Sequence, residues 1–447
     1  MNQIIVSVSG VRGVIGQGLT PEVAARFAAA LGTYANGGPI VLGRDSRPSG
    51  RMLRHAALAG LQSVGCRVTD IGIAPTPTVG LAVRSCGAAG GLQITASHNP
   101  APWNGLKLFG PDGAVLPAAE GEKVRAVYES GALRGAAWDA LGSATPGTTA
   151  ADDHCRAVLA HVNVERIRGR AIAVFLDANG GAGGLLGQGL LQALGCRLTT
   201  HACEPDGHFR HEAEPVPAHL GDVSRLVRDS GGAFGCVLDP DADRLALIDE
   251  TGRCLSEELT LALCVQFRLS RERGPVVVNM STSRVIADIA KQFGISFHRS
   301  AVGEANVVAK MREVGAVIGG EGNGGVIDPR VGWVRDPFLA MGLLLNLIAE
   351  SGKTLGPLAD ALPQYHIIKV KYTVPREKLP AALAALSARW PDAAADRTDG
   401  LRLDWADRWV HVRGSNTEPI VRVIAEAPRA EDAAALCREA GTFLEGA

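Results

Sequence analysis

Aromatic side chains are scarce in this chain of 447 residues, where Phe, Trp and Tyr together account for 4%. Hydrophobic residues nevertheless make up 46%, so large aliphatic cores can form and disorder is not expected. An excess of positive charge is also missing, because the net charge is −1 and no block of Lys and Arg is present. These absences argue against a nucleic-acid partner and against a basic segment that binds a membrane surface.

Long hydrophobic runs and closely spaced cysteines are missing as well. The longest apolar runs are too short to span a bilayer, and the first residues carry neither a basic leader nor a long apolar region. The nine cysteines are scattered without a CxxC pair, a pattern that suggests reduced thiols. We therefore expect a cytoplasmic protein without a membrane partner.

Glycine, by contrast, is abundant at 55 residues, and much of it follows short aliphatic runs. Five such runs end in a polar, glycine-rich loop and lead into a helical pattern. Continuous apolar runs suit strands that are buried on both faces, and their alternation with helices predicts α/β layers. Ligands in such sheets bind at the carboxyl ends of the strands, where these loops lie. The runs with their loops lie at 38–50, 171–184, 235–244, 275–283 and 316–325.

The length and the loop composition predict four domains. A small, polar, turn-rich segment at 133–153 indicates a linker near residue 150, and further breaks lie near 249–253 and 361–365. Beyond the last break the pattern indicates antiparallel strands around a helix. We expect three similar α/β domains, with mixed sheets sandwiched by helices, and a smaller C-terminal α+β domain. The expected boundaries are 1–150, 151–252, 253–362 and 363–447.

Three aspartates stand at alternate positions directly after the apolar run FGCVL. In an extended segment the carboxylates of Asp239, Asp241 and Asp243 share one face, where they repel each other unless a cation lies among them. Hard divalent cations such as Mg²⁺ prefer oxygen ligands. The triplet therefore predicts a metal site at the end of a strand.

Other interpretations of the acidic triplet remain open. A calcium loop of the EF-hand type would have Glu250 at its twelfth position, but Arg244 stands where that loop needs glycine. An aspartyl-phosphate enzyme, with the phosphate on Asp239, or a metal-dependent sugar transferase would also place such acids after a strand. A solvated acidic turn is the interpretation without function.

A serine beside a histidine follows another apolar run, LQIT. Asn99 precedes Pro100 and is biased away from helix, so this loop can expose the hydroxyl of Ser97 next to His98. A serine hydroxyl by itself is a poor nucleophile. A phosphorylated serine instead stores a phosphoryl group, whose charge a divalent cation would neutralise. A Ser–His pair alone is more often structural, so a functional role for this loop needs support from the residues around it.

Taken together, these motifs resemble the α-D-phosphohexomutases, which interconvert the 1- and 6-phosphates of hexoses. The runs TASHNP and NGLK resemble the active serine loop of that family, and DPDADR resembles its metal loop. Further likenesses to family segments are SGVRG, GRDSRPSG, PDGHF and the distal phosphate loop RGSNTEPIVR. In the order named, these segments lie at 95–100, 104–107, 239–244, 9–13, 43–50, 205–209 and 413–422.

The resemblance implies a fold, a reaction and a cofactor. Four domains would surround a central cleft, and the protein would be an isomerase that acts on small-molecule hexose phosphates. A phosphoserine at Ser97 and a hexose 1,6-bisphosphate intermediate would carry the phosphate. One Mg²⁺ would bind the phosphoserine and the three aspartates. Lys107 would take and return the hydroxyl proton, with a lowered pKa and with help from His98, while Arg12 would approach the serine.

The resemblance also implies a substrate-binding set and leaves the sugar open. The loop GEGNGG carries Asn323 and Gly325 where the family usually has serine and histidine, a form that looks like an archaeal-type subgroup. We expect glucosamine phosphate as the substrate, with mannose or glucose phosphate as the alternative. A sugar-phosphate sensor without catalysis, and either a monomer or a homo-oligomer, also remain open. The implied substrate-binding residues are Arg244, Glu321, Asn323, Arg413, Ser415, Asn416, Thr417 and Arg422.

Overall fold

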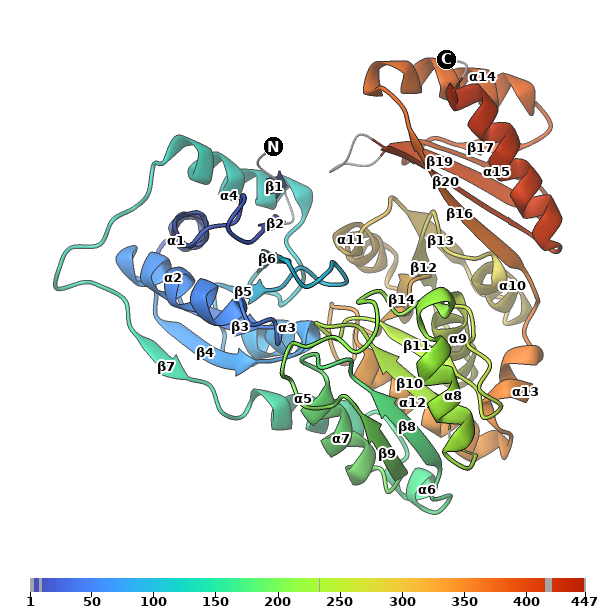
Figure 1. The fold of residues 1–447 in the computed structure, drawn as a ribbon, viewed down its shortest axis with the longest axis horizontal. Coiled ribbons are helices and arrows are strands. Elements are labelled where there is room, and N and C mark those ends of the chain that lie inside the picture. The colour runs from blue at the N-terminus through green and yellow to red at the C-terminus, as the bar shows by residue number, and fades with distance from the viewer. Residues whose placement is uncertain (1–3, 8–9, 233, 415–419, 446–447) are drawn as a thin grey trace.

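A computed structural model describes residues 4–7, 10–232, 234–414 and 420–445 of the chain. These residues form four sheets with their helices, which we call units I to IV in chain order (Figure 1). Within the described residues no helix is long and apolar enough to cross a membrane. We propose that the domain boundaries fall near residues 150, 252 and 362, between these units.

Unit I contains a seven-stranded mixed sheet. Its elements are β1 (Ile4–Ser7), β2 (Gly10–Val14), α1 (Pro21–Tyr34), β3 (Ile40–Arg44), α2 (Gly50–Ser63), β4 (Val68–Ile73), α3 (Thr76–Ser85), β5 (Gly90–Ile94), β6 (Trp103–Phe109), α4 (Ala118–Ser130) and β7 (Ala144–Pro146). The strand order is β1-β2-β6-β5-β3-β4-β7. Strands β5, β3 and β4 run parallel, as the α/β pattern predicted, and β6 adds an antiparallel strand beside β5.

Unit II repeats the central part of this arrangement with four strands. Its elements are α5 (Ala150–Leu159), α6 (Val164–Arg168), β8 (Ala173–Asp177), α7 (Gly184–Ala193), β9 (Arg197–His201), η1 (Pro217–His219), α8 (Gly221–Asp229), β10 (Phe234–Leu238) and β11 (Leu245–Ile248). The order is β11-β10-β8-β9, with β10, β8 and β9 parallel and β11 antiparallel at the edge.

Unit III has the same topology as unit II. Its elements are α9 (Glu258–Arg271), β12 (Val276–Asn279), α10 (Val285–Gln292), β13 (Phe297–Ser300), α11 (Glu304–Val314), β14 (Ile318–Glu321), β15 (Gly325–Ile327), α12 (Pro337–Ser351) and α13 (Leu355–Asp360). The order β13-β12-β14-β15 again ends in an antiparallel edge strand, β15. Each of the three sheets has hydrophobic clusters on both faces, which confirms three similar α/β sandwiches.

Unit IV differs from the others, as predicted. Its elements are β16 (His366–Thr373), η2 (Arg376–Lys378), α14 (Leu379–Arg389), β17 (Ala394–Asp396), β18 (Leu401–Asp404), β19 (Trp409–Gly414), β20 (Ile420–Ala427) and α15 (Ala430–Glu445). The five strands, in the order β16-β20-β19-β18-β17, are all antiparallel. One face of this sheet packs against α14 and α15, which leaves the other face free to meet the remaining units.

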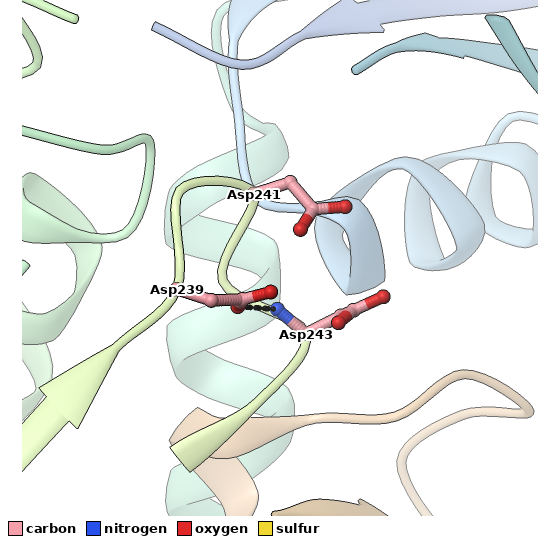
Figure 2. A group of neighbouring side chains, drawn as sticks. All are labelled: Asp239, Asp241 and Asp243. Carbon is pink, nitrogen blue, oxygen red and sulfur yellow. Dashed lines mark hydrogen bonds between the residues drawn. The ribbon is translucent and has the colours of Figure 1, made fainter. Parts of the chain in front are cut away.

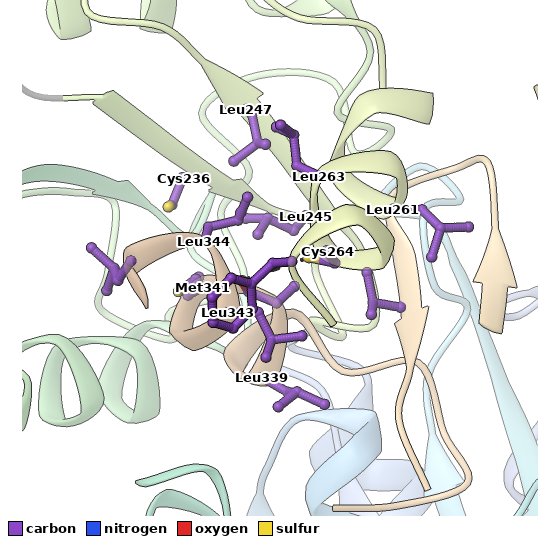
Figure 3. Close-up of a cluster of buried hydrophobic side chains, with 14 of the residues drawn as sticks. Cys236, Leu245, Leu247, Leu261, Leu263, Cys264, Leu339, Met341, Leu343 and Leu344 are labelled. Atoms are coloured by element: carbon purple, nitrogen blue, oxygen red, sulfur yellow. Dashed lines mark hydrogen bonds between the residues drawn. The ribbon is translucent and has the colours of Figure 1, made fainter. Parts of the chain in front are cut away.

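Helix α12 ties unit II to unit III, because nearly all of its side chains are buried. Figure 3 shows leucines of this helix packed against side chains from β11 and α9. A single hydrophobic cluster therefore extends through units II and III, whereas units I and IV have cores of their own. The loops carried by units II and III are thus held in a fixed relation to each other.

Candidate active site

Three loops that carry the sequence motifs occupy the same place in units I, II and III. Each joins a parallel strand to the antiparallel strand beside it: β5 to β6, β10 to β11, and β14 to β15. The first loop carries Ser97, the second the three aspartates, and the third begins beyond Glu321 and carries Asn323. The repeated topology therefore delivers one motif from each unit to a common region, where side-chain contacts join them.

The carboxylates of Asp239, Asp241 and Asp243 are fully buried, and one oxygen atom of each lies within 4.8 Å of the others. Figure 2 shows the three side chains projecting from one loop, with the N–H of Asp243 donating to Asp239. Burial and the two neighbouring carboxylates raise the pKa of Asp239 well above its usual value. Three acids packed this closely repel each other, and a cation among them removes that repulsion.

The hydrogen bonds of the triplet leave one oxygen free on each aspartate. Asp239 Oδ1 accepts from the backbone N–H groups of Asp243 and Arg244, and Asp241 Oδ2 accepts from the Thr76 hydroxyl at 2.6 Å. Asp243 Oδ2 accepts from two cations, described below. Asp239 Oδ2, Asp241 Oδ1 and Asp243 Oδ1 have no hydrogen-bond partner although they are buried. Three unpartnered carboxylate oxygens fit one divalent cation that prefers oxygen ligands.

The surroundings of the triplet also exclude an EF-hand. In that motif the calcium loop joins two helices, whereas here strand β10 leads in and strand β11 leads out.

Asp243 connects the metal loop to units I and III. Its Oδ2 accepts from Lys107 Nζ of β6 at 2.9 Å and from Arg335 Nη2, just before α12, at 2.6 Å. Burial raises the pKa of Asp243, but the charges of Arg335, Lys107 and Arg244 outweigh burial and lower the pKa well below its usual value. This carboxylate is therefore ionised and holds three units together.

The pKa of Lys107 differs from the sequence expectation. Burial acts to lower it, but the carboxylates of Asp243, Glu304 and Asp241 outweigh burial and raise the pKa above its usual value. The expectation of a lowered pKa is therefore wrong. Its physical reason is that Lys107 Nζ lies 2.9 Å from Asp243 and 3.8 Å from Glu304, so the ammonium form is stabilised.

Ser97 is 2% exposed and has φ of +52°, in the left-handed region that residues other than glycine seldom adopt. Such a conformation costs about 1–3 kcal/mol and persists only where the surroundings enforce it. The N–H of Ser97 donates to the Thr95 hydroxyl at 2.8 Å. The Ser97 hydroxyl lies 3.4 Å from Nδ1 of His98. The loop thus presents this hydroxyl beside an imidazole in one fixed orientation.

Two arginines flank the serine loop. Arg12 of β2 donates to the Asn99 side chain at 3.2 Å, and Arg244 lies 3.4 Å from Glu214. The positive charge of Arg244, burial and the charge of Arg12 lower the pKa of His98 well below its usual value. His98 is therefore uncharged at neutral pH, and one nitrogen of its ring carries no proton.

In the third loop, Glu321 is buried and has several partners. Its Oε1 accepts from the Asn279 amide at 2.7 Å, and its Oε2 accepts from Arg335 Nη1 at 2.8 Å. Asn323 lies beside it, with a buried amide oxygen that has no partner. At Gly325 a Cβ would lie 2.2 Å from Cδ of Arg335, so the arginine fills the space that any side chain at that position would need.

Unit IV contributes a row of cations to the face of its sheet opposite α14 and α15. In the strand registers, Arg422 of β20 stands directly opposite Arg413 of β19 and Lys371 of β16. Arg413 is held by Asp399 at 3.0 Å, whereas Arg422 and Lys371 are exposed. Like charges directly opposite each other destabilise a sheet, so this row is suited to an anion. Ser415, Asn416 and Thr417 lie outside the described residues.

Two cavities make up the cleft between the units. One, of about 340 Å³, lies between units I and III, and its charged lining consists of Arg12, Lys107, Glu304, Glu321 and Arg335. The other, of about 240 Å³, is lined by all four units and includes His98, Glu214, Arg244, Glu257, Asn323, Lys369, Lys371 and Arg422. Ser97 lines neither cavity, but its neighbours Thr95 and His98 each line one.

No sequence motif pointed to Arg335, Glu304 or Lys371, although all three line these cavities. Arg335 is the only one of the three with a visible signal, because it and Asp336 are the two charged residues in the otherwise apolar stretch GWVRDPFLA. Glu304 begins a helix, and Lys371 alternates with apolar residues in a strand, so both look like ordinary surface positions in the sequence.

Comparison with protein families gives four matches in chain order. The matching models describe phosphoglucomutase/phosphomannomutase, as alpha/beta/alpha domain I over residues 3–134, domain II over 152–252, domain III over 257–365 and C-terminal domain over 368–440.

Similar proteins match over nearly the whole chain. A probable phosphoglucosamine mutase of Methanopyrus kandleri is 36% identical, covering 95% of this chain and 94% of that protein. A phosphoglucomutase/phosphomannomutase of Thermococcus kodakarensis is 37% identical, covering 95% and 94%. Among solved structures, a phosphoglucomutase/phosphomannomutase family protein of Burkholderia thailandensis superposes with a TM-score of 0.87 at 27% identity, covering 99% and 97%.

We predict that Asp241→Asn lowers the affinity for Mg²⁺ or Mn²⁺ by more than about tenfold, because it removes one of three converging anionic oxygens. Mn²⁺ binding followed by electron paramagnetic resonance measures this directly. Mg²⁺ is also expected to raise the Tm of the wild type but not of this variant. Asp222→Asn, an equal charge change on exposed α8, is the control and keeps the wild-type affinity. Equal affinities for wild type and Asp241→Asn would contradict the hypothesis that the acidic triplet binds the metal ion.

Proposed function

Because the chain belongs to the phosphoglucomutase/phosphomannomutase family, whose members are isomerases that move phosphate within sugar phosphates, we propose that it converts glucosamine 6-phosphate to glucosamine 1-phosphate through a phosphoserine. The observation that carries the proposal is the pairing of two features in one cleft. One cavity is lined by His98 of the serine loop and by Lys371 and Arg422 of unit IV, and the acidic triplet contacts Lys107, which lines the other cavity.

The proposed cycle moves one phosphoryl group at a time. The O–P bond to Oγ of phosphorylated Ser97 breaks as an O–P bond forms to the free hydroxyl of the hexose phosphate. The resulting hexose 1,6-bisphosphate reorients within the cleft, and its other phosphoryl group is transferred to Oγ of Ser97. Each hydroxyl that gains a phosphate loses its proton, and each oxygen that is released regains one.

His98 is the proposed proton-transfer residue, and Lys107 is the proposed hydrogen-bond donor to the transferred group. His98 Nδ1 lies 3.4 Å from Ser97 Oγ, within reach of a proton that leaves or returns to that oxygen. Lys107 Nζ lines the cavity between units I and III while it is held by Asp243. We assign to His98 the transfer of the proton from the attacking sugar hydroxyl to the released Oγ, and in the reverse direction on return. We assign to the ammonium of Lys107 a hydrogen bond to the transferred group.

Asp239, Asp241, Asp243 and an oxygen of phosphorylated Ser97 would hold one Mg²⁺. When bound, this cation offsets the negative charge of the transferred group. Arg12 adds positive charge from the side of unit I, because its guanidinium already contacts the serine loop.

Substrate recognition divides into a sugar part and a phosphate part. Glu321 and Asn323 are the proposed acceptors and donors for sugar hydroxyls, since both line the cleft. The phosphate that is not reacting would bind the cations of unit IV, with Arg244 opposite them. The proposed residues of this second site are Arg413, Arg422 and Lys371, together with Ser415, Asn416 and Thr417.

Glucosamine is the proposed sugar because similar proteins carry that name, and the cavity between units I and III contains two carboxylates beside its three cations. Glu304 is 7% exposed, its Oε1 is bound by the N–H of Arg335, and its Oε2 lies 3.8 Å from Lys107 Nζ. A protonated amine is a favourable partner for such a carboxylate. Several similar proteins are named probable phosphoglucosamine mutase, and one is named phosphoglucomutase/phosphomannomutase, which is the alternative function.

We predict that wild-type protein incubated with hexose 1,6-bisphosphate gains the mass of one phosphoryl group and that Ser97→Ala gains none. Turnover should fall in Ser97→Ala to the background rate, because no acceptor oxygen remains at that position. Intact-mass spectrometry measures the modification, and hydroxylamine treatment should leave it in place. A phosphate lost in hydroxylamine, or retained by Ser97→Ala, would favour an aspartyl phosphate on Asp239. Ser85→Ala, remote from the site in α3, is the matched control.

The sugar is tested by comparing substrates. We expect kcat/KM for glucosamine 6-phosphate to exceed that for mannose and glucose phosphates by at least about tenfold, because only the amino sugar carries a cation for the carboxylates. Glu304→Gln should reduce this ratio, whereas Glu313→Gln, on the same helix and exposed, should preserve it. A higher kcat/KM for mannose or glucose phosphate would assign the alternative function.

We predict that Lys371→Met raises KM for the hexose phosphate about tenfold and changes kcat little. A charge-assisted hydrogen bond contributes about 1.5–3 kcal/mol, and a non-reacting phosphate uses it equally in the ground and transition states. Steady-state kinetics at fixed bisphosphate concentration give both constants. Lys353→Met, after α12 and outside the cleft, is the control. An unchanged KM would mean that the non-reacting phosphate does not bind Lys371.

A further inference from the structure

One motif of the sequence has no role in the proposed cycle: GRDSRPSG at 43–50, the loop that follows β3. Its second arginine, Arg47, is completely buried. A buried guanidinium is costly unless its hydrogen bonds are satisfied, so its partners indicate what it does.

Arg47 binds the backbone of the serine loop through two carbonyl oxygens. Its Nη2 donates to the carbonyl oxygen of Ser97 at 2.7 Å and to that of Asn99 at 2.6 Å. Its Nη1 pairs with the carboxylate of Asp45, which is also fully buried. Asp45 in turn accepts from the Thr95 hydroxyl at 2.7 Å.

These hydrogen bonds form a closed ring that includes Ser97, the residue with the left-handed backbone conformation. The Thr95 hydroxyl that donates to Asp45 also accepts the N–H of Ser97, while Arg47 holds the Ser97 carbonyl oxygen. Both backbone polar groups of Ser97 are therefore fixed by one Asp–Arg pair. A strained conformation persists where its surroundings hold it from both sides, as they do here.

Unit II covers the other side of this guanidinium with a loop at 205–215, which we call the docking loop. The ring of Phe209 lies 5.1 Å from Cζ of Arg47, in cation–π geometry. Gly207 approaches so closely that a Cβ there would lie 2.3 Å from the carbonyl oxygen of Ser46. Nε of Arg47 is buried without a hydrogen-bond partner.

The docking loop is itself anchored within unit II. Asn179 Oδ1 accepts the N–H groups of Arg210 and His211, at 2.6 and 3.1 Å. At its far end the loop presents Glu214 to Arg244 at 3.4 Å, and the same oxygen lies 3.9 Å from His98. The loop that carries Phe209 thus contacts both the serine loop, at His98, and the arginine that binds the serine loop.

We propose that Arg47 is a positioning residue for Ser97 and that Phe209 of the docking loop holds it in place. This inference rests on the proposed phosphoserine cycle. Arg47 acts through the backbone and touches neither the sugar nor the phosphate. Its loss therefore slows phosphoryl transfer at Ser97 while substrate binding by unit IV and cation binding by the acidic triplet are preserved.

The test uses the full chain and follows phosphoryl transfer directly. Arg47→Lys keeps the charge but cannot bind two carbonyl oxygens and Asp45 together. We expect it to lower kcat, and the single-turnover rate from phosphorylated enzyme to glucosamine 6-phosphate, about 100-fold. KM and Mn²⁺ affinity should stay at their wild-type values. Arg26→Lys is the matched control, because Arg26 also donates to a backbone carbonyl and faces a tyrosine ring, remote from the site.

A second pair of variants tests the docking loop without disturbing the buried ion pair. Phe209→Leu should lower the single-turnover rate about three- to tenfold, and Phe209→Tyr, which restores an aromatic face, should recover it. These variants decide the question even where Arg47→Lys does not fold.

The outcomes separate this inference from the proposed function. Wild-type protein without phosphoserine or turnover would remove the proposed function and this inference with it. Wild-type protein that turns over, together with Arg47→Lys or Phe209→Leu at the wild-type single-turnover rate, would overturn the positioning role alone. A fall in rate accompanied by an equal loss of KM and Mn²⁺ affinity would also overturn it, because that pattern indicates general damage to the cleft.

Discussion

The arrangement of the cleft depends on one buried carboxylate, that of Asp243. It belongs to the metal loop of unit II, and its Oδ2 is shared by Lys107 of unit I and Arg335 of unit III. Removing ions from water is expensive, and their mutual attraction compensates only when the geometry is good and all polar atoms are bound. Here the remaining oxygen of Asp243 has no hydrogen-bond partner, and Nε of Arg244 lies 3.9 Å from it, which leaves it able to bind a metal ion. The same side chain therefore joins three units and leaves one ligand atom free.

Repetition of one topology explains why chemistry-bearing loops from distant parts of the chain converge. In units I, II and III the loop in question leaves a parallel strand and returns along an antiparallel neighbour, so its tip lies at the carboxyl end of the parallel strand. Ligands bind at this edge in α/β sheets because the loops and the ends of the strands present polar groups there. Unit IV lacks that topology and contributes the face of an antiparallel sheet instead, with cations in adjacent strands.

In the third loop, Gly325 and Arg335 pack directly against each other. A side chain at position 325 is impossible while Arg335 occupies the adjoining space, with Cδ 2.2 Å from where a Cβ would be. The guanidinium binds Glu321 and Asp243 together, so a cation lies between the third loop and the acidic triplet. The absence of a side chain at Gly325 thus leaves the space that the side chain of Arg335 occupies.

The sequence by itself determined the fold class, the order of three α/β units and a different fourth, and the positions of the serine loop, the acidic triplet and the third loop with Glu321 and Asn323. These features depend on local periodicity and on short motifs, which neighbouring residues carry. Tertiary structure alone decided the partners of Asp243, the cation row of Lys371 with Arg413 and Arg422, and the contact of Phe209 with Arg47. It also decided the direction of the Lys107 pKa, which sequence reasoning had reversed. The physical reason is that charge and packing at a buried site depend on every neighbour in space, and here those neighbours come from different units.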